Sequence, residues 1–186
     1  MSKKALKRVK KKFKKAVIDT HSDFGDDTIV IDRSVLRECA RFLREDEKCS
    51  FEMLVDVTAV DYLGMRDENE PRYEVVYHFL SLTHKHRLRV KVPLEANDVN
   101  VDTISDIYLA ANWGERECYD MYGVAFKGHP DLRRVLLYEE FEGYPLRKDY
   151  HIHGSQPRVD LLEIERPTTN MYQPNFGEYG PEKENR

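Results

Sequence analysis

The sequence predicts a two-layer α+β fold, in which helices cover a mixed, mostly antiparallel sheet and an extended C-terminal tail follows. Three β-rich runs stand close together between residues 51 and 93. Runs with apolar residues at helical spacing precede and follow them, and these supply the covering layer. With 186 residues, the chain is long enough for one core of roughly 100 to 150 residues with arms or tails at its ends.

The first twenty residues are predicted to form a basic amphipathic arm. Nine of the 30 Lys and Arg residues lie in the first fifteen positions, whereas residues 16–186 hold 21 basic against 34 acidic side chains, a balance of −13. Four apolar residues recur in the arm at helical spacing: Leu6, Val9, Phe13 and Val17. Such a helix suits an anionic membrane surface, a nucleic acid, an acidic partner or its own domain. The sequence leaves these alternatives open.

A strand and a helix are expected next. Thr28–Ile31 is short, β-branched and bounded by Asp residues, as strands often are. Asp32 or Ser34 can cap the following helix, which is expected to run to about Glu45. Its apolar positions fall on one face: Val35, Leu36, Cys39, Phe42 and Leu43.

Three strands complete the predicted sheet. Residues 51–63 alternate between apolar and polar positions, and after the charged loop 64–71 the run 73–83 has the β-rich composition of a central strand. A tight turn then leads to the strand 87–93, which Pro93 is expected to end. The buried face of the first strand is expected to hold Met53, Val55, Val57 and Ala59.

Cysteine and histidine spacing argues against several kinds of site. The cysteines at positions 39, 49 and 118 stand too far apart for an iron–sulfur or zinc motif and are predicted to be buried free thiols. His78, His84 and His86 lie around a hairpin turn without converging partners, so we assign no metal there. The sequence also lacks a Gly-rich dinucleotide loop, a P-loop and any run of ~20 apolar residues.

The segment 112–150 has the most unusual composition in the chain. It combines the only Trp with a dense mixture of Tyr, Gly and charged residues. Asn112 and Glu115 have the spacing of a capping box, which predicts that a helix begins there. Gly123 is placed to end that helix in the left-handed conformation.

The charged triplet in this helix resembles an acid/base pair only in its composition. Consecutive helical residues point in different directions, so Glu115, Arg116 and Glu117 cannot converge on one substrate. Arg116 is instead expected to pair with Asp120, four residues along the helix. The buried side of the helix is expected to hold Cys118, Met121 and Tyr122.

Little regular secondary structure is expected after Gly123. Residues 129–131 form a turn signal, and the adjacent Arg133 and Arg134 can brace a loop or fix a carboxylate. Residues 143–150 are an extended segment whose backbone must be satisfied by packing on other groups.

Three motifs in this segment resemble a known family. They read ANWGERECYDMYG (residues 111–123), HPDLRR (residues 129–134) and GYPLRKDY (residues 143–150). Together with LVDVTAVDYL (residues 54–63) and the two strands after it, they are similar to the 30 kDa subunit family of respiratory complex I. The resemblance covers about residues 28–160.

The resemblance implies a non-catalytic structural and assembly subunit in the peripheral arm of a proton-translocating NADH-quinone oxidoreductase. It implies docking on the 49 kDa-type subunit, the small iron–sulfur subunit and other peripheral-arm subunits near the quinone site. FMN and the iron–sulfur clusters are then expected in other subunits, with no cofactor in this chain. The expected location is peripheral, on the cytoplasmic face of the bacterial inner membrane, with membrane association through the complex and no nucleic-acid partner.

On this interpretation the chain divides into the arm 1–20, an α+β domain 21–150 and an extended partner-binding tail 151–186. The residues expected at partner interfaces are Glu115, Arg116, Glu117, His129, Arg133, Arg134, Arg147, Lys148, Tyr172, Phe176 and Tyr179. Three alternatives remain. The first is the equivalent subunit of a membrane-bound hydrogenase or another quinone-type oxidoreductase. The second is a binder of anionic surfaces or nucleic acid through the basic arm, and the third is a free-standing enzyme with Glu115 or His129 as base.

Overall fold

The computed structural model describes residues 2–67, 69–154 and 156, and it confirms the α+β class. The large sheet has the strand order β1-β2-β5-β4-β3, and a short parallel pair, β6 and β7, is separate from it. The helices are α1 (Ser2–Phe13), α2 (Leu36–Glu45) and α3 (Ala111–Tyr122), with 3-10 turns at Lys14–Ala16 and Arg33–Val35. The strands are β1 (Val17–Asp23), β2 (Asp26–Ile31), β3 (Met53–Asp61), β4 (Tyr73–Ser81), β5 (His86–Leu94), β6 (Asn100–Asp102) and β7 (Ala125–Lys127).

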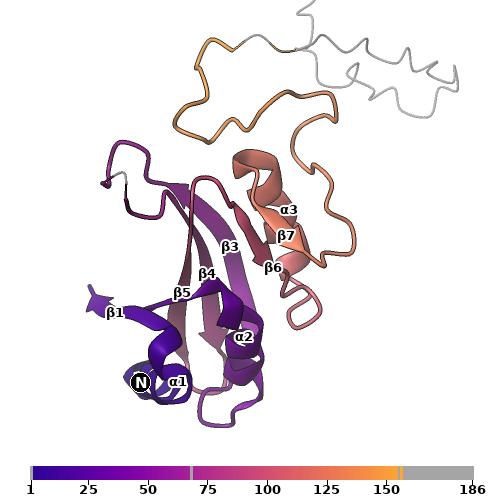
Figure 1. The fold of residues 1–186 in the computed structure, drawn as a ribbon. Coiled ribbons are helices and arrows are strands. Elements are labelled where there is room, and N and C mark those ends of the chain that lie inside the picture. The colour runs from indigo at the N-terminus through magenta and orange to yellow at the C-terminus, as the bar shows by residue number, and fades with distance from the viewer. Residues whose placement is uncertain (1, 68, 155, 157–186) are drawn as a thin grey trace, which may run out of the picture.

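The large sheet is mixed, as predicted. Neighbouring strands run antiparallel except for β2 and β5, which pair in parallel. β4 lies between β5 and β3, which confirms that it is an interior strand. Alternate residues of β4, such as Val75, Tyr77 and Phe79, join residues of all three helices in one buried cluster. In Figure 1, α1 and α2 lie together against the sheet, and α3 lies on the β3 side.

The basic helix α1 packs on its own domain. Ala5, Val9 and Phe13 are buried in the main core, while Lys4, Lys7, Lys10, Lys11 and Lys12 are exposed. Val17 does not continue this stripe, because α1 ends at Phe13 and Val17 begins β1. β1 is not apparent from the sequence, because its residues, VIDTHSD, are mostly polar and only half-buried or exposed.

A β-bulge near the start of β3 changes which of its residues are buried. The register between β3 and β4 shifts between Leu54 and Asp56. Leu54 and Val57 are buried, whereas Met53 and Val55 are exposed, so the prediction that Met53 and Val55 belong to the buried face is wrong. One extra residue in a strand reverses the alternation on one side of it.

Pro93 lies within β5 and does not end it. It is opposite Glu74 in the antiparallel ladder with β4, and the strand continues to Leu94. On the other side of β5, β2 pairs only from Arg89 to Lys91. Pro93 therefore has no β2 residue paired with it, and its missing N–H group is tolerated as it is at a sheet edge.

The Asp32 carboxylate accepts a hydrogen bond from the Ser34 N–H at 2.9 Å and so caps the 3-10 turn Arg33–Val35 that leads into α2, whereas no side chain caps α2 itself. The three cysteines are buried free thiols, as predicted. Within the described part of the chain, no helix has the length and apolar character needed to cross a bilayer.

Candidate functional site

Most of the predicted interface residues lie on α3 or on residues 128–150, which we call the α3 loop. The short strand β7, which was not predicted from the sequence, comes between the two. The α3 loop contains turns and bends but no regular helix or strand. Its backbone is held instead by side chains of α3 and β3, as the following contacts show.

Asp120 anchors the first half of the α3 loop. It is buried on α3, and one carboxylate oxygen accepts a hydrogen bond from the Arg134 guanidinium at 2.7 Å. The other oxygen accepts from three consecutive backbone N–H groups, those of residues 135, 136 and 137, at 3.0, 2.8 and 2.9 Å. Burial alone would raise the pKa of Asp120, but these bonds outweigh it and lower the pKa below its ordinary value.

Arg116 reaches toward the loop and not along the helix. Its guanidinium donates to the carbonyl oxygens of Arg133 and Arg134 at 3.1 and 3.2 Å. It also lies 5.0 Å from the ring centroid of Trp113. The predicted pair of Arg116 with Asp120 is therefore wrong, because Arg134 occupies that carboxylate from outside the helix.

A second buried carboxylate, Asp61 at the end of β3, holds the other end of the α3 loop. It accepts hydrogen bonds from Arg72 at 2.9 and 2.7 Å and from the N–H of Lys148 at 2.9 Å. Burial alone would raise the pKa of Asp61, but these bonds and one from the Leu63 N–H hold it at about 2. Asp61 and Lys148 lie 87 positions apart, so no local pattern in the sequence indicates this contact.

Arg147 is packed between the domain and the loop. Its Nε donates to the carbonyl of Tyr122 at 2.5 Å, and its guanidinium lies 4.5 Å from the Tyr144 ring and 5.4 Å from the Tyr73 ring. Gly123 ends α3 with φ +74°, as predicted. A Cβ atom there would come within 2.5 Å of the Arg147 guanidinium, so this glycine also permits the close approach of the loop.

Glu115 is a buried residue that connects α3 with a neighbouring segment, and it is not part of a helix cap. α3 begins at Ala111, before Asn112, and no side chain caps it, so the predicted capping box is wrong. The fully buried Glu115 carboxyl accepts a hydrogen bond from the Ile104 N–H at 2.8 Å and contacts the Thr103 hydroxyl. Burial raises the pKa of Glu115 to about 7. Its carboxyl connects α3 with the end of β6.

The His129 ring lies beside Glu115, with Nε2 4.0 Å from a carboxyl oxygen. Nδ1 accepts a hydrogen bond from the Asp131 N–H at 3.0 Å, so Nε2 carries the proton and donates to the Asn112 carbonyl at 3.1 Å. Both side chains are fully buried. This geometry suits neither of them to act as a general base on a substrate.

The other predicted interface residues fall into two groups. Glu117, Arg133 and Lys148 are exposed, whereas Tyr172, Phe176 and Tyr179 lie outside the described residues. Two exposed apolar side chains were not among the predicted interface residues, Trp113 and Leu136. The lone tryptophan in a charged helix was the available signal for the first, whereas Leu136 stands in an apolar run whose exposure the sequence does not indicate.

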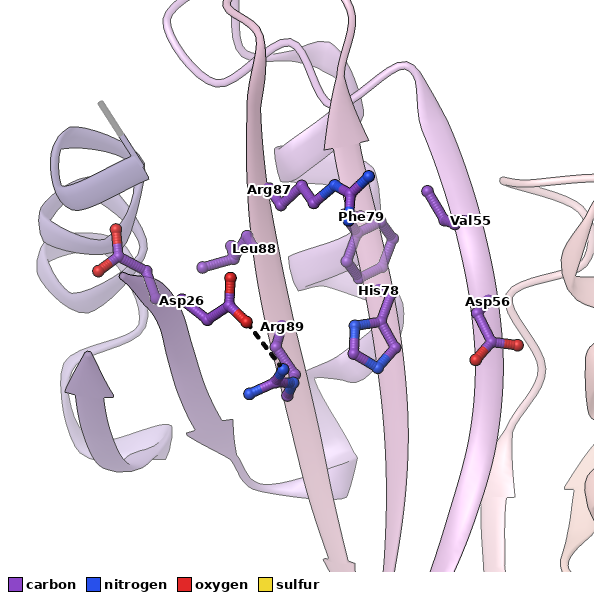
Figure 2. Close-up of a pocket in the computed structure, with 9 residues that line it drawn as sticks. Asp26, Val55, Asp56, His78, Phe79, Arg87, Leu88 and Arg89 are labelled. Carbon is purple, nitrogen blue, oxygen red and sulfur yellow. Dashed lines mark hydrogen bonds and ion pairs between the residues drawn. The ribbon is translucent and has the colours of Figure 1, made fainter. Parts of the chain in front are cut away.

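The face of the sheet opposite to the core carries a hollow of about 300 Å³ (Figure 2). Arg89 contacts Asp26 at 3.3 Å, and His78 lies across the ladder between Arg89 and Asp56. Burial and the Arg89 charge lower the pKa of His78. In residues 2–67, 69–154 and 156, no group of His, Cys, Asp and Glu side chains is arranged to hold a metal ion.

The fold and the site define an α+β domain in which buried carboxylates fix a long irregular loop and apolar side chains are exposed beside it. The family model for the respiratory-chain NADH dehydrogenase 30 kDa subunit matches residues 29–156. The chain belongs to this family, which confirms the resemblance found in the sequence.

Similar proteins agree with this assignment. The C subunit of NADH-quinone oxidoreductase from Citrifermentans bemidjiense is 41% identical over 151 residues, which cover 81% of this chain and 90% of the relative. The corresponding C subunit from Ruegeria pomeroyi is 47% identical over 141 residues, covering 75% of this chain and 68% of the relative.

Two solved structures share the fold. A trypsin-resistant fragment (1–134) of Nqo5 has a TM-score of 0.59 and 29% identity, covering 70% of this chain and 98% of the fragment. A chain of the membrane-bound sulfane sulfur reductase, an archaeal respiratory membrane complex, has a TM-score of 0.66 and 24% identity, covering 82% of this chain and 86% of that chain. The second likeness concerns the fold alone.

Proposed function

We propose that this chain is a structural and assembly subunit of a proton-translocating NADH-quinone oxidoreductase, and that α3 and the α3 loop form its docking surface. The observation that carries the proposal is the preorganised α3 loop. Asp120 and Asp61 fix its two ends with buried, charge-assisted hydrogen bonds. A rigid loop loses less conformational entropy on binding, so a surface prepared in this way favours assembly.

Within that complex, we propose docking on the 49 kDa-type and small iron–sulfur subunits near the quinone site. The exposed Glu117, Arg133 and Lys148 lie on the surface that would meet them. FMN and the iron–sulfur clusters belong to other subunits in this proposal. The chain is then held peripherally at the cytoplasmic face of the inner membrane through its partners.

The test is purification of the tagged full chain from detergent-solubilised membranes of its native host, followed by identification of the chains that accompany it. The expected result is a set of NADH dehydrogenase subunits that includes the 49 kDa-type and small iron–sulfur subunits. Recovery of the chain without such partners would overturn the proposal. Recovery of hydrogenase subunits would assign it to a related complex instead.

A matched pair of variants tests the docking surface itself. Arg133→Glu reverses an exposed charge on the α3 loop, and Arg87→Glu reverses an exposed charge on the opposite face of the sheet. If the α3 loop meets the partners, Arg133→Glu lowers the yield of assembled complex more than Arg87→Glu does. Equal losses, or a greater loss with Arg87→Glu, would contradict the choice of this surface.

A further inference from the structure

A groove of about 330 Å³ lies between the bulged part of β3, the side of α3 that carries Trp113 and Glu117, and residues 135–136 of the α3 loop. Its exposed large apolar side chains are Trp113 at 64%, Leu136 at 63% and Val55 at 48%. Three large apolar residues around one groove form a patch of the kind that marks binding surfaces. Tryptophan in particular is enriched among the residues that dominate binding energies.

The exposure of Val55 follows from a specific irregularity of the chain. A regular strand would place Val55 on the same face as the buried Val57, as the sequence pattern predicts. The bulge between Leu54 and Asp56 instead turns Val55 outward. Bulges re-aim side chains at sheet edges, and β3 is an edge strand of the large sheet. An apolar residue that the strand could have buried is therefore presented at the surface.

The groove has a negative rim. Glu117 and Asp56 both line it, and both are exposed. Neither carboxylate has a hydrogen bond or ion pair to another side chain in the described part of the chain. Other exposed carboxylates do have such partners, for example Asp106 with Arg37 and Asp131 with Arg133. Two unpaired carboxylates beside an apolar groove favour a partner that carries positive charge.

We infer that this groove binds a segment of a neighbouring subunit that presents one aliphatic or aromatic side chain flanked by Lys or Arg. The apolar side chain would lie against Trp113 and Leu136, and the basic side chain would pair with Glu117 or Asp56. This inference rests on the proposed function, since it names the chemistry of the partner at the same docking surface.

Two other occupants fit the charge of the groove less well. Residues 157–186 of this chain hold six acidic and four basic side chains, so they bring net negative charge to a negative rim. A second copy of the chain has a net charge of −4, with nine basic residues in positions 1–15 and a balance of −13 over residues 16–186. Like charges placed opposite each other disfavour the C-terminal residues and the acidic body of a second copy. The basic helix α1 of a second copy has its apolar side chains Ala5, Val9 and Phe13 already buried in its own core, so they are not available to enter the groove.

The occupant is identified by crosslinking in the native membrane. A photoreactive benzoylphenylalanine replaces Trp113 in the full chain, and the crosslinked peptide is sequenced after irradiation of the intact complex. The expected product is a peptide of another subunit that contains an apolar residue next to Lys or Arg. A crosslink to residues 157–186, to a second copy or to lipid would overturn the inference, as would no crosslink from an assembled complex.

Substitutions then measure the contribution of the groove. Trp113→Ala is expected to lower the yield of complex by about tenfold or more, the effect of losing an interface tryptophan. Leu136→Ser is compared with Leu82→Ser, an equally exposed leucine (59%) that does not line the groove. The groove variants should retain the unfolding midpoint of the unmodified chain, and complex yields equal to that of Leu82→Ser would contradict the inference.

The charge of the partner is tested by reversal. Glu117→Lys should weaken assembly, and an acidic replacement of the crosslinked basic residue in the partner should restore it. Failure of that rescue would refute the charge pairing. If the tagged chain still recovers NADH dehydrogenase subunits while the groove variants assemble normally, the inference fails and the proposed function stands. If no such subunits are recovered, the proposed function itself fails.

Discussion

Asp120 and Arg134 form a buried ion pair at 2.7 Å between α3 and the α3 loop. The Asp120 side chain is fully buried and that of Arg134 is 14% exposed. The same guanidinium also donates to the carbonyl oxygens of Phe141 and Gly143 at 2.8 and 3.0 Å. One ion pair thus links α3 with two separate parts of the α3 loop.

We predict that Asp120→Ala lowers the free energy of unfolding by about 3–5 kcal/mol, because it leaves a buried guanidinium and three N–H groups without their acceptor. Denaturant unfolding measures the loss, and limited trypsin digestion should detect faster cleavage after Arg134. Asp131→Ala is the control, since Asp131 also pairs with an arginine but is solvent-exposed. Equal effects of the two substitutions would show that burial is not what gives Asp120 its importance.

Gly114→Ala is predicted to destabilise the domain although alanine is the better helix former. A Cβ atom at Gly114 would lie 2.9 Å from the Cβ of Val57, so α3 must move away from β3. The gain in helix propensity is about 1 kcal/mol, whereas overpacking of this kind costs about 1–3 kcal/mol. Glu117→Ala is the control at an exposed position of the same helix, and it should not lower the unfolding midpoint.

The buried Glu115 is predicted to make stability depend on pH. Burial raises its pKa from an ordinary value of 4.5 to about 7, so the folded state holds a proton that the unfolded chain releases between these values. The stability contributed by this group is therefore fully present below pH 4.5 and is lost as the pH rises toward 7, with a slope of at most about 1.4 kcal/mol per pH unit.

Glu115→Gln isolates this effect. Its amide oxygen can accept from the Ile104 N–H, and its NH₂ group can donate to the Thr103 hydroxyl, so both contacts of the protonated acid are retained. As the pH rises from 4.5 to 7, the unfolding free energy of the unmodified protein should fall relative to that of Glu115→Gln. A difference that stays constant over this range would disprove the shifted titration.

The sheet and the helix faces were predictable because they depend on local patterns. Leu36, Cys39 and Leu43 recur at helical spacing and are buried. The turn between β4 and β5 was predictable because only a few residues separate these two antiparallel strands. The exposure of Val55 was not predictable, because alternation cannot show where a strand takes an extra residue. At the site, Gly123 was correctly placed as the end of α3.

The partners of the site residues could not be predicted. Asp120 has a plausible partner four residues away in Arg116, but folding brings Arg134 to it with three backbone N–H groups. Glu115 has the spacing of a helix cap, yet burial against Thr103 and Ile104 decides its role. Contacts between separate parts of the chain determine these partners, and the spacing of residues in a single sequence carries no information about such contacts.

Gly123→Ala is predicted to release the second half of the α3 loop. At φ +74°, any side chain strains the backbone, and here a Cβ atom would also come within 2.5 Å of the Arg147 guanidinium and 2.6 Å of the Tyr144 ring. Gly64→Ala is a matched control, because Gly64 has φ +75° with nothing within 4 Å of the added atom. The control bears only the backbone cost of about 1–2 kcal/mol for a left-handed residue. Gly123→Ala should lose more stability than Gly64→Ala does. Trypsin should also cleave it faster after Arg147, since the packing of Arg147 on Tyr144 is broken. Equal stability and equal cleavage of the two variants would mean that Gly123 serves only to end α3, and that the close approach of Arg147 does not hold the loop in place.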